Sequence, residues 1–342
     1  MKVGILTGGG DAPGTNAAIR AVVRKGIQHY CDEIIGIKDG WRGLLDGEFI
    51  SLDMKVTSGI LNRGGSILGY SRTNPFKREG GAEKILRNTQ KKGIEAVVVI
   101  GGDDTLSVAH KLGDFGLKCV GVPKTIDNDL SRTDYTFGFN TAVTIATEAL
   151  DRLHTTAEAH HRVIILEVMG RYTGWIALEA GLAGGADVIL IPEKPFDVEE
   201  ICKYIERRQK RGRNFSLVVV AEGAKPKDGK EITYSDGVDE FGHVRFGGVG
   251  YYLGREIEKC LNVETRVVIL GHIQRGGSPT PFDRILATKF GIAAIDLVHQ
   301  GKFGCLVGIQ GNKIVSVPLK DVIGKRKTVD SKLYDIASVF FG

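Results

Sequence analysis

The chain has 342 residues, of which 42% are hydrophobic and 25% charged. These proportions are typical of a globular protein, and the length suits two α/β lobes better than one small core. The formal net charge is +5, from mostly dispersed cations. This balance suits an enzyme of small anionic molecules and does not indicate a nucleic-acid surface.

The five cysteines are widely spaced and form no C-x-x-C pair. The sequence therefore predicts neither a disulfide framework nor a zinc ribbon. No stretch approaches the ~18 apolar residues of a membrane span. We expect no signal peptide, because the apolar start Val3–Leu6 runs directly into glycines. A cytoplasmic protein with no nucleic-acid or membrane partner is the expectation.

Short apolar runs alternate with segments of helical periodicity along the chain. The expected strands are Val3–Leu6, Ala96–Ile100, Cys119–Val122, Val163–Val168, Val188–Ile191, Leu217–Ala221 and Val267–Leu270. The expected helices are Thr15–Tyr30, Thr105–Lys111, Asn140–His160, Trp175–Leu182, Val198–Lys210, Val249–Cys260 and Asp283–His299. This alternation predicts parallel sheets with ligand sites at the carboxyl ends of the strands. Residues 225–248 are polar, and we expect an exposed excursion there, with a hairpin as one interpretation.

Glycine-rich segments follow two of the expected strands. The run from Gly8 to Gly14 opens a helix, so its amides suit an anion, although a tight strand–helix turn explains it equally well. In the second segment, Gly101-Gly102-Asp103-Asp104-Thr105, we expect Asp103 to hold Mg²⁺ directly or through water. Thr105 suits either a helix cap or a phosphate contact. Arg72 lies in another glycine-rich stretch, where a solvated role is the alternative.

Further polar groups follow other strands. Asp127 and Asp129 lie two residues apart in an expected extended loop, where their side chains point the same way. One carboxylate can act as general base on a sugar hydroxyl while the other orients that base or the metal; a structural turn is the alternative. Met169-Gly170-Arg171, Glu222 and Gly271-His272-Ile273-Gln274-Arg275 also end apolar strands. Arginine and histidine at such positions suit phosphate and hydroxyl recognition.

In this order, the motifs Gly-Gly-Asp-Ala-Pro-Gly, Gly-Gly-Asp-x-Thr, Pro-x-Thr-Ile-Asp-Asn-Asp, Met-Gly-Arg and Gly-His-Ile-Gln-Arg-Gly-Gly resemble the bacterial 6-phosphofructokinase family. The resemblance covers the chain except residues 225–248. It implies two Rossmann-like lobes with parallel sheets flanked by helices and an active site in the cleft between them. The implied donor lobe is 1–138 plus about 274–324. The implied fructose-6-phosphate lobe is 139–273 plus about 325–342, with an exposed insertion at 225–248.

The resemblance also implies roles for individual residues. Asp127 resembles the base that activates the 1-hydroxyl of fructose 6-phosphate, and Asp103 the Mg²⁺ site. The implied catalytic set is Asp127, Thr125, Arg171, Arg72 and Lys124. The implied donor set is Gly10, Gly102, Asp104, Thr105 and Lys124. The implied sugar-phosphate set is Thr125, Ile126, Asp127, Asp129, Arg162, Met169, Gly170, Arg171, Glu222, Arg266, His272, Ile273, Gln274 and Arg275. Within this set, Arg162 and Arg266 resemble arginines that reach a neighbouring subunit's site, which implies a homodimer or homotetramer.

Two positions resemble the pyrophosphate-dependent branch of the family. ATP users usually carry glycine where this chain has Asp104 and Lys124. Asp104 adds a negative charge where the α-phosphate would lie, and two unit charges ~4 Å apart repel by about 4 kcal/mol at an effective dielectric near 20. We therefore expect reversible, Mg²⁺-dependent phosphoryl transfer from pyrophosphate to fructose 6-phosphate, a reaction of glycolysis and gluconeogenesis. An ATP-dependent enzyme of the same fold and a catalytically idle sugar-phosphate sensor are the alternatives.

Overall fold

The computed structural model describes residues 1–229, 232–238 and 241–342. The chain divides into two compact units, and each unit is described by itself. Unit 1 comprises residues 1–141 and 275–326, and unit 2 comprises residues 142–274 and 327–342. Within the described residues, no helix is both long and apolar enough to cross a membrane.

Unit 1 is built around one sheet with the strand order β14-β13-β5-β4-β1-β2-β3, and β6 pairs with β5 off this path. Its strands are β1 (Lys2–Thr7), β2 (Glu33–Ile37), β3 (Phe49–Leu52), β4 (Ala96–Gly101), β5 (Cys119–Thr125), β6 (Phe137–Gly138), β13 (Cys305–Gln310) and β14 (Lys313–Pro318). Its helices are α1 (Thr15–Tyr30), α2 (Trp41–Asp46), α3 (Gly81–Lys92), α4 (Asp103–Asp114) and α9 (Pro281–His299), with short 3₁₀ turns at Pro75–Lys77 and Leu319–Asp321.

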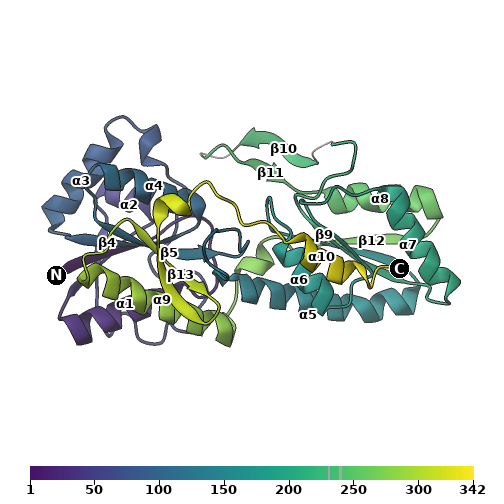
Figure 1. The fold of residues 1–342 in the computed structure, drawn as a ribbon, viewed down its shortest axis with the longest axis horizontal. Helices are drawn as coiled ribbons and strands as arrows, with labels where there is room; N and C mark the ends of the chain where they lie inside the picture. The colour runs from purple at the N-terminus through teal and green to yellow at the C-terminus, as the bar shows by residue number, and fades with distance from the viewer. Residues whose placement is uncertain (230–231, 239–240) are drawn as a thin grey trace. The chain divides into compact units, whose positions relative to one another are not determined.

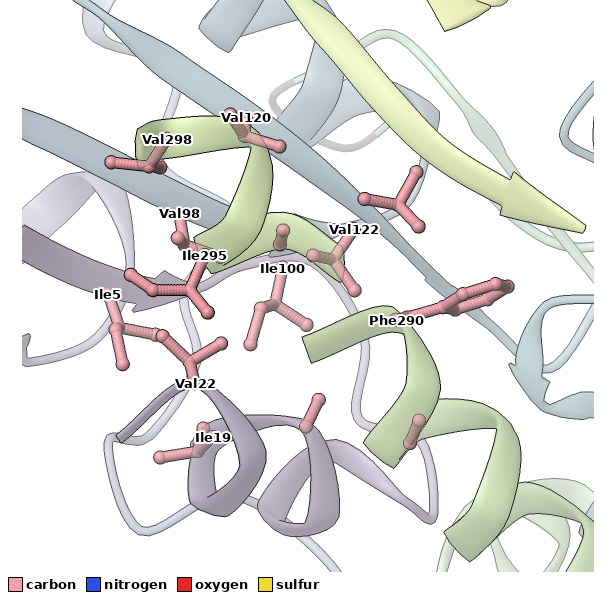
Figure 2. Packing of buried hydrophobic residues seen from close by; sticks show 14 of the residues in the cluster. Ile5, Ile19, Val22, Val98, Ile100, Val120, Val122, Phe290, Ile295 and Val298 are labelled. Atoms are coloured by element: carbon pink, nitrogen blue, oxygen red, sulfur yellow. The ribbon is translucent and has the colours of Figure 1, made fainter. Parts of the chain in front are cut away.

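The core of unit 1 lies between this sheet and the helices α1 and α9, which cover one of its faces; α2, α3 and α4 lie on the other (Figure 1). Ile5, Val98 and Val120 point from neighbouring parallel strands toward Val22 of α1 and Ile295 of α9 (Figure 2). These side chains are at most 2% exposed. The β-branched runs predicted as strands are therefore the middle of the sheet, where both faces are covered.

Two edges of this sheet differ from the expected parallel arrangement. β3 pairs antiparallel with β2, and β14 pairs antiparallel with β13. In the second pair Gln310 lies opposite Lys313, so Gly311 and Asn312 form a two-residue hairpin turn. Antiparallel strands need only such a short turn, whereas a parallel pair needs a long crossover. The sheet is therefore mixed, with the expected parallel strands in the middle and an antiparallel strand at each edge.

Unit 2 has a four-stranded parallel sheet of order β12-β7-β9-β8 among the described residues. Its strands are β7 (Val163–Val168), β8 (Val188–Leu190), β9 (Ser216–Ala221) and β12 (Thr265–Ile269). Its helices are α5 (Phe139–His160, which begins in unit 1), α6 (Trp175–Ala183), α7 (Val198–Lys210), α8 (Val249–Leu261) and α10 (Ser331–Ser338), with a 3₁₀ turn at Gly271–Arg275 whose last residue belongs to unit 1. Apolar residues of α7 and α8 pack on one face of this sheet, and Ala157 of α5 packs with strand residues that point the other way.

The expected excursion at residues 225–248 contains a hairpin. β10 (Thr233–Val238) pairs antiparallel with β11 (Val244–Phe246), which confirms that interpretation. Parts of the excursion, residues 230–231 and 239–240, lie outside the described residues. Just after it, the buried Glu167 of β7 accepts hydrogen bonds from the backbone N–H groups of Gly248 (3.1 Å) and Gly250 (2.8 Å). This carboxylate caps α8 and sets where the helix begins.

Candidate active site

In unit 1, the glycine loop at residues 8–10 is packed against Thr105. Strands β1, β4 and β5 run parallel, with Thr7 opposite Ile100 and Gly101 opposite Pro123. The loop and the start of α4 therefore follow the same edge of the sheet. A Cβ at Gly8 would lie 2.7 Å from the Thr105 side chain, so only glycine allows this approach. Thr105 is 3% exposed, and the N-terminal residue that caps α4 is Gly102. Packing is thus the observed role of Thr105, and no side-chain cap is seen.

The side chain of Lys124, at the end of β5, lies against the glycine loop. Its Nζ donates a hydrogen bond to the carbonyl oxygen of Gly8 (2.8 Å) and a second to that of Gly10. The side chain is 1% exposed. Burial, and then the Arg275 charge, lower the pKa of Lys124 to about 7, while Asp11 and Asp127 act in the opposite direction. The lysine therefore fixes the Gly8 and Gly10 carbonyls in place, and we call these two hydrogen bonds the loop brace. The sequence did not suggest this role.

The loop after β5 carries the two expected carboxylates, but it is not extended. Asn128 has a φ of 51°, in the left-handed region. Its side chain accepts a hydrogen bond from the backbone N–H of Thr136 (3.0 Å) and donates one to the Asp134 carbonyl (3.3 Å). The Asp127 N–H donates to Thr125 Oγ1 (3.1 Å). The expectation of an extended loop is wrong, because Asn128 tolerates this conformation and its amide holds the turn.

Two neighbouring carboxylates of unit 1 act on Asp129. Burial raises the pKa of Asp129 to about 7, and the charges of Asp127 and then Asp103 add to this shift. Asp103 Oδ1 accepts a hydrogen bond from the Gly324 N–H (3.1 Å). Asp103 and Asp104 occupy the first turn of α4, where the helix dipole favours negative charge. The sequence placed the start of this helix two residues too late.

These carboxylates fit a magnesium ion that is held together with phosphate oxygens. No group of three His, Cys, Asp or Glu side chains forms a complete metal cage among the residues the structure describes. Mg²⁺ usually needs only one or two protein carboxylates when substrate phosphates complete its coordination. Burial chiefly raises the Asp129 pKa, and a cation at this place would relieve the added repulsion from Asp127 and Asp103.

Two arginines also lie close to the glycine loop. Arg275 NH1 donates to the Asp11 carbonyl (3.1 Å) and lies against Gly10. Arg72 follows Ser71, whose carbonyl accepts the Gly9 N–H (3.1 Å), and its charge acts on Lys124. The resemblance assigned Arg275 to the sugar-phosphate set. In the structure it belongs to unit 1 and contacts the glycine loop.

In unit 2, the ends of β7 and β9 bring Met169, Gly170, Arg171 and Glu222 together. The Arg171 N–H donates to Glu222 Oε1 (3.0 Å), and the Glu222 N–H donates to the Val168 carbonyl (2.8 Å). Gly170 has a φ of 145°, and a Cβ there would collide with the Thr173 carbonyl. Arg171 itself adopts a left-handed φ of 55°. Strained backbone of this kind at a strand end is typical of a binding site.

Arg162 and Arg266 lie at the other end of the same sheet. Arg162 precedes β7, and Arg266 pairs with Ile164 near the start of that strand. Both arginines bind Glu264: Arg162 Nε donates to Oε2 (2.7 Å), and Arg266 NH2 contacts Oε1. Six strand residues, or ~20 Å, separate this end from Met169. The two arginines are therefore remote from the Met169–Arg171 turn of their own unit.

The remaining expected residues are placed as follows. Ile126 and Gln274 have fully buried side chains. The Gln274 amide donates to the Gly271 carbonyl (3.1 Å), which is a structural role. His272 and Ile273 are exposed, and Ile273 is 67% accessible. Among these residues, only the histidine and the isoleucine present side chains at the surface of the unit.

Comparison with known proteins identifies the family. A model of the phosphofructokinase family matches residues 2–298, so the chain belongs to that family. It is 57% identical, over the full length of both chains, to a pyrophosphate–fructose 6-phosphate 1-phosphotransferase of Streptomyces coelicolor. It is also 51% identical, over 98% of each chain, to ATP-dependent 6-phosphofructokinase 3 of the same organism. A phosphofructokinase structure from Saccharomyces cerevisiae superposes with a TM-score of 0.82 and 34% identity; the match covers 94% of this chain and 45% of the yeast chain.

Three residues near these sites were missed at the level of sequence. Asn128 shapes the carboxylate loop, Glu264 pairs with both arginines, and Tyr70 lies against Lys124. For Asn128, the signal was an asparagine between two aspartates, a common left-handed turn residue. Neither Glu264 nor Tyr70 belongs to a recognisable motif: Tyr70 acts on Lys124, and Glu264 joins the nearby Arg266 to the distant Arg162.

Proposed function

We propose that this chain transfers a phosphoryl group from pyrophosphate to the 1-hydroxyl of fructose 6-phosphate, giving fructose 1,6-bisphosphate and phosphate. The observation that carries the choice of donor is the pair Asp104 and Lys124 in unit 1. Asp104 adds a carboxylate to the first turn of α4, and Lys124 braces the glycine loop. A nucleotide's α-phosphate would be repelled by the added carboxylate, whereas pyrophosphate has no such group.

In this proposal Asp127 is the general base. Its carboxylate takes the proton of the 1-hydroxyl, the sugar oxygen bonds to the nearer phosphorus of pyrophosphate, and the P–O–P bridge bond breaks to release phosphate. The loop held by Asn128 and Thr125 orients Asp127. Asp103 would hold Mg²⁺, which neutralises phosphate charge when bound. By family resemblance, we assign Thr125, Arg72 and Arg171 to the transferring phosphoryl group, and Met169, Gly170, Glu222 and His272 to the sugar phosphate.

We also propose that the active form is a homo-oligomer. Arg162 and Arg266 lie at the end of the unit 2 sheet away from Arg171, so they fit contacts to a neighbouring subunit's substrate. Cytoplasmic location stays a prediction from the absence of paired cysteine motifs.

The second candidate is an ATP-dependent 6-phosphofructokinase, which is favoured by the 51% identity to a relative of that name. Initial rates with pyrophosphate, ATP and tripolyphosphate, at fixed fructose 6-phosphate and Mg²⁺, separate the two candidates. We expect turnover with pyrophosphate and at least a hundredfold lower kcat/KM with ATP. A preference for ATP would overturn the proposed donor and leave the family assignment intact.

A further inference from the structure

Tyr70 belongs to none of the motifs discussed above, yet its segment is tied to the glycine loop. Next to it, the Ser71 carbonyl accepts the Gly9 N–H (3.1 Å), and Ser71 Oγ donates to the Asp39 carbonyl (2.7 Å). Ser71, which directly follows Tyr70, is therefore held from both the loop and the β2–α2 connection.

The ring of Tyr70 faces the Lys124 ammonium, whose nitrogen lies 5.0 Å from the ring centroid. Two of the three ammonium protons already point to the Gly8 and Gly10 carbonyls. The surrounding charges oppose one another, because Asp11 and Asp127 favour the ammonium while Arg275 and Arg72 disfavour it. At a buried position, an aromatic face is a strong partner for a cation.

The loop brace also orients the peptide between Gly10 and Asp11. In a trans peptide the carbonyl and the following N–H point in opposite directions. When Lys124 holds the Gly10 carbonyl, it therefore turns the Asp11 N–H to the other side of that peptide. Oriented amides of this kind, ahead of the first turn of α1, are what an anion-binding loop requires.

We infer that Tyr70 is a positioning residue of the donor site: its ring holds the Lys124 ammonium against the Gly8 and Gly10 carbonyls and so sets the loop shape that receives pyrophosphate. This inference rests on the proposed function. The ring face is the active part. The Tyr70 hydroxyl is buried near Thr15 and Ala12, in contacts looser than an ordinary hydrogen bond.

The first test compares two variants. Tyr70→Leu removes the aromatic face, and we expect KM for pyrophosphate to rise about tenfold, with KM for fructose 6-phosphate changed less than twofold. Tyr70→Phe keeps the face, and we expect both constants within about threefold of the wild type. Phe49→Leu is the matched control, because it removes a ring that faces Lys92 at 5.7 Å on the edge strand β3. An unchanged KM in Tyr70→Leu, or equal damage in Tyr70→Phe, would overturn the inference.

The second test keeps the shape of the ring. Phenylalanines with one to four fluorines at position 70 weaken the negative face stepwise with little change in volume. We expect log KM for pyrophosphate to rise steadily with fluorination. A merely structural ring would give a flat series, and that result would refute the role of the face.

A third readout needs no substrate and separates the inference from the proposed function. In a double-mutant cycle of Tyr70→Leu and Lys124→Met, measured by urea unfolding, we expect a coupling of at least about fivefold in the unfolding equilibrium constant. Additive effects would overturn the contact. If the wild type turns over ATP and not pyrophosphate, the proposed donor fails, and the fluorinated series is then read on KM for ATP.

Discussion

At the residue scale, Lys124 is the most unusual group of unit 1. A lysine that is 1% exposed loses the hydration of its charge, and two carbonyl oxygens only partly replace it. Burial accordingly lowers its pKa to about 7. A bound pyrophosphate would favour the ammonium again, so the donor and the loop brace reinforce each other.

The lowered pKa predicts a pH dependence of stability. Between pH 7 and about 10.5 the unfolded chain keeps a proton on Lys124 that the folded chain has lost. The contribution of this residue to the free energy of unfolding therefore rises with pH across that window, by up to about 1.4 kcal/mol per unit. Below pH 7 its full unfavourable effect is present.

Lys124→Met abolishes this dependence. The difference in unfolding free energy between the wild type and the variant should shift in favour of the wild type as pH rises from 7 to 9.5, measured by urea unfolding. Lys118→Met, at an exposed lysine, is the control for loss of one lysine. A difference that stays constant over this range would show that the pKa of Lys124 is not lowered in the folded protein.

A second prediction at this scale concerns Asp104 and the choice of phosphoryl donor. Asp104→Gly removes the carboxylate that we propose repels the α-phosphate, so kcat/KM for ATP should rise by one to three decades while pyrophosphate turnover falls. Lys124→Gly alone should impair pyrophosphate turnover without admitting ATP. The double variant should show the largest gain with ATP and non-additive effects. Unchanged ATP use in Asp104→Gly would contradict the role assigned to this carboxylate.

At the scale of elements, the turn at residues 125–129 determines where Asp127 lies. Its shape depends on Asn128, whose left-handed backbone and two amide hydrogen bonds are specific to that residue. Asn128→Ala strains the backbone and leaves the Thr136 N–H without its partner, so we expect a loss of about 2 kcal/mol in stability and a tenfold or larger fall in kcat.

Asn128→Gly separates these two effects. Glycine accepts the left-handed φ but makes no side-chain hydrogen bonds. Its stability should lie between those of the wild type and Asn128→Ala, with kcat still reduced. If both variants keep wild-type kcat under conditions where they remain folded, the turn does not position the base.

Elements with a strong local sequence pattern were predicted, and elements without one were missed. The central strands are continuous β-branched runs, and α1 and α7 carry clear helical periodicity, so both kinds were identified with their observed bounds or close to them. β2, β3, β13 and β14 were missed, as were α2, α3 and α10. The Gly311-Asn312 dipeptide is a hairpin signal that was overlooked. For α3, mainly polar residues hid a narrow apolar face.

At the scale of the whole molecule, the proposal that Arg162 and Arg266 reach a neighbouring subunit's substrate predicts an active site that is shared between subunits. Asp127→Ser alone should lower kcat by 10²–10⁴ with KM little changed, since the sugar pocket stays intact. Mixing it with Arg266→Ala should restore part of the activity, because some sites in the hybrids combine an intact Asp127 with an intact Arg266. No recovery after proven subunit exchange would place both residues in the same chain's site.

The sequence alone determined the family and the parallel strands at the centre of each sheet, and it supplied the proposed site residues, because these depend on contiguous motifs and on apolar runs of local periodicity. The tertiary structure decided what those residues contact. Lys124 contacts the glycine loop and Tyr70, Thr105 packs on Gly8, and Glu264 binds Arg162; all of these contacts join segments far apart in the sequence. Such contacts depend on how distant segments of the chain pack together, and a local sequence pattern does not show which segments meet.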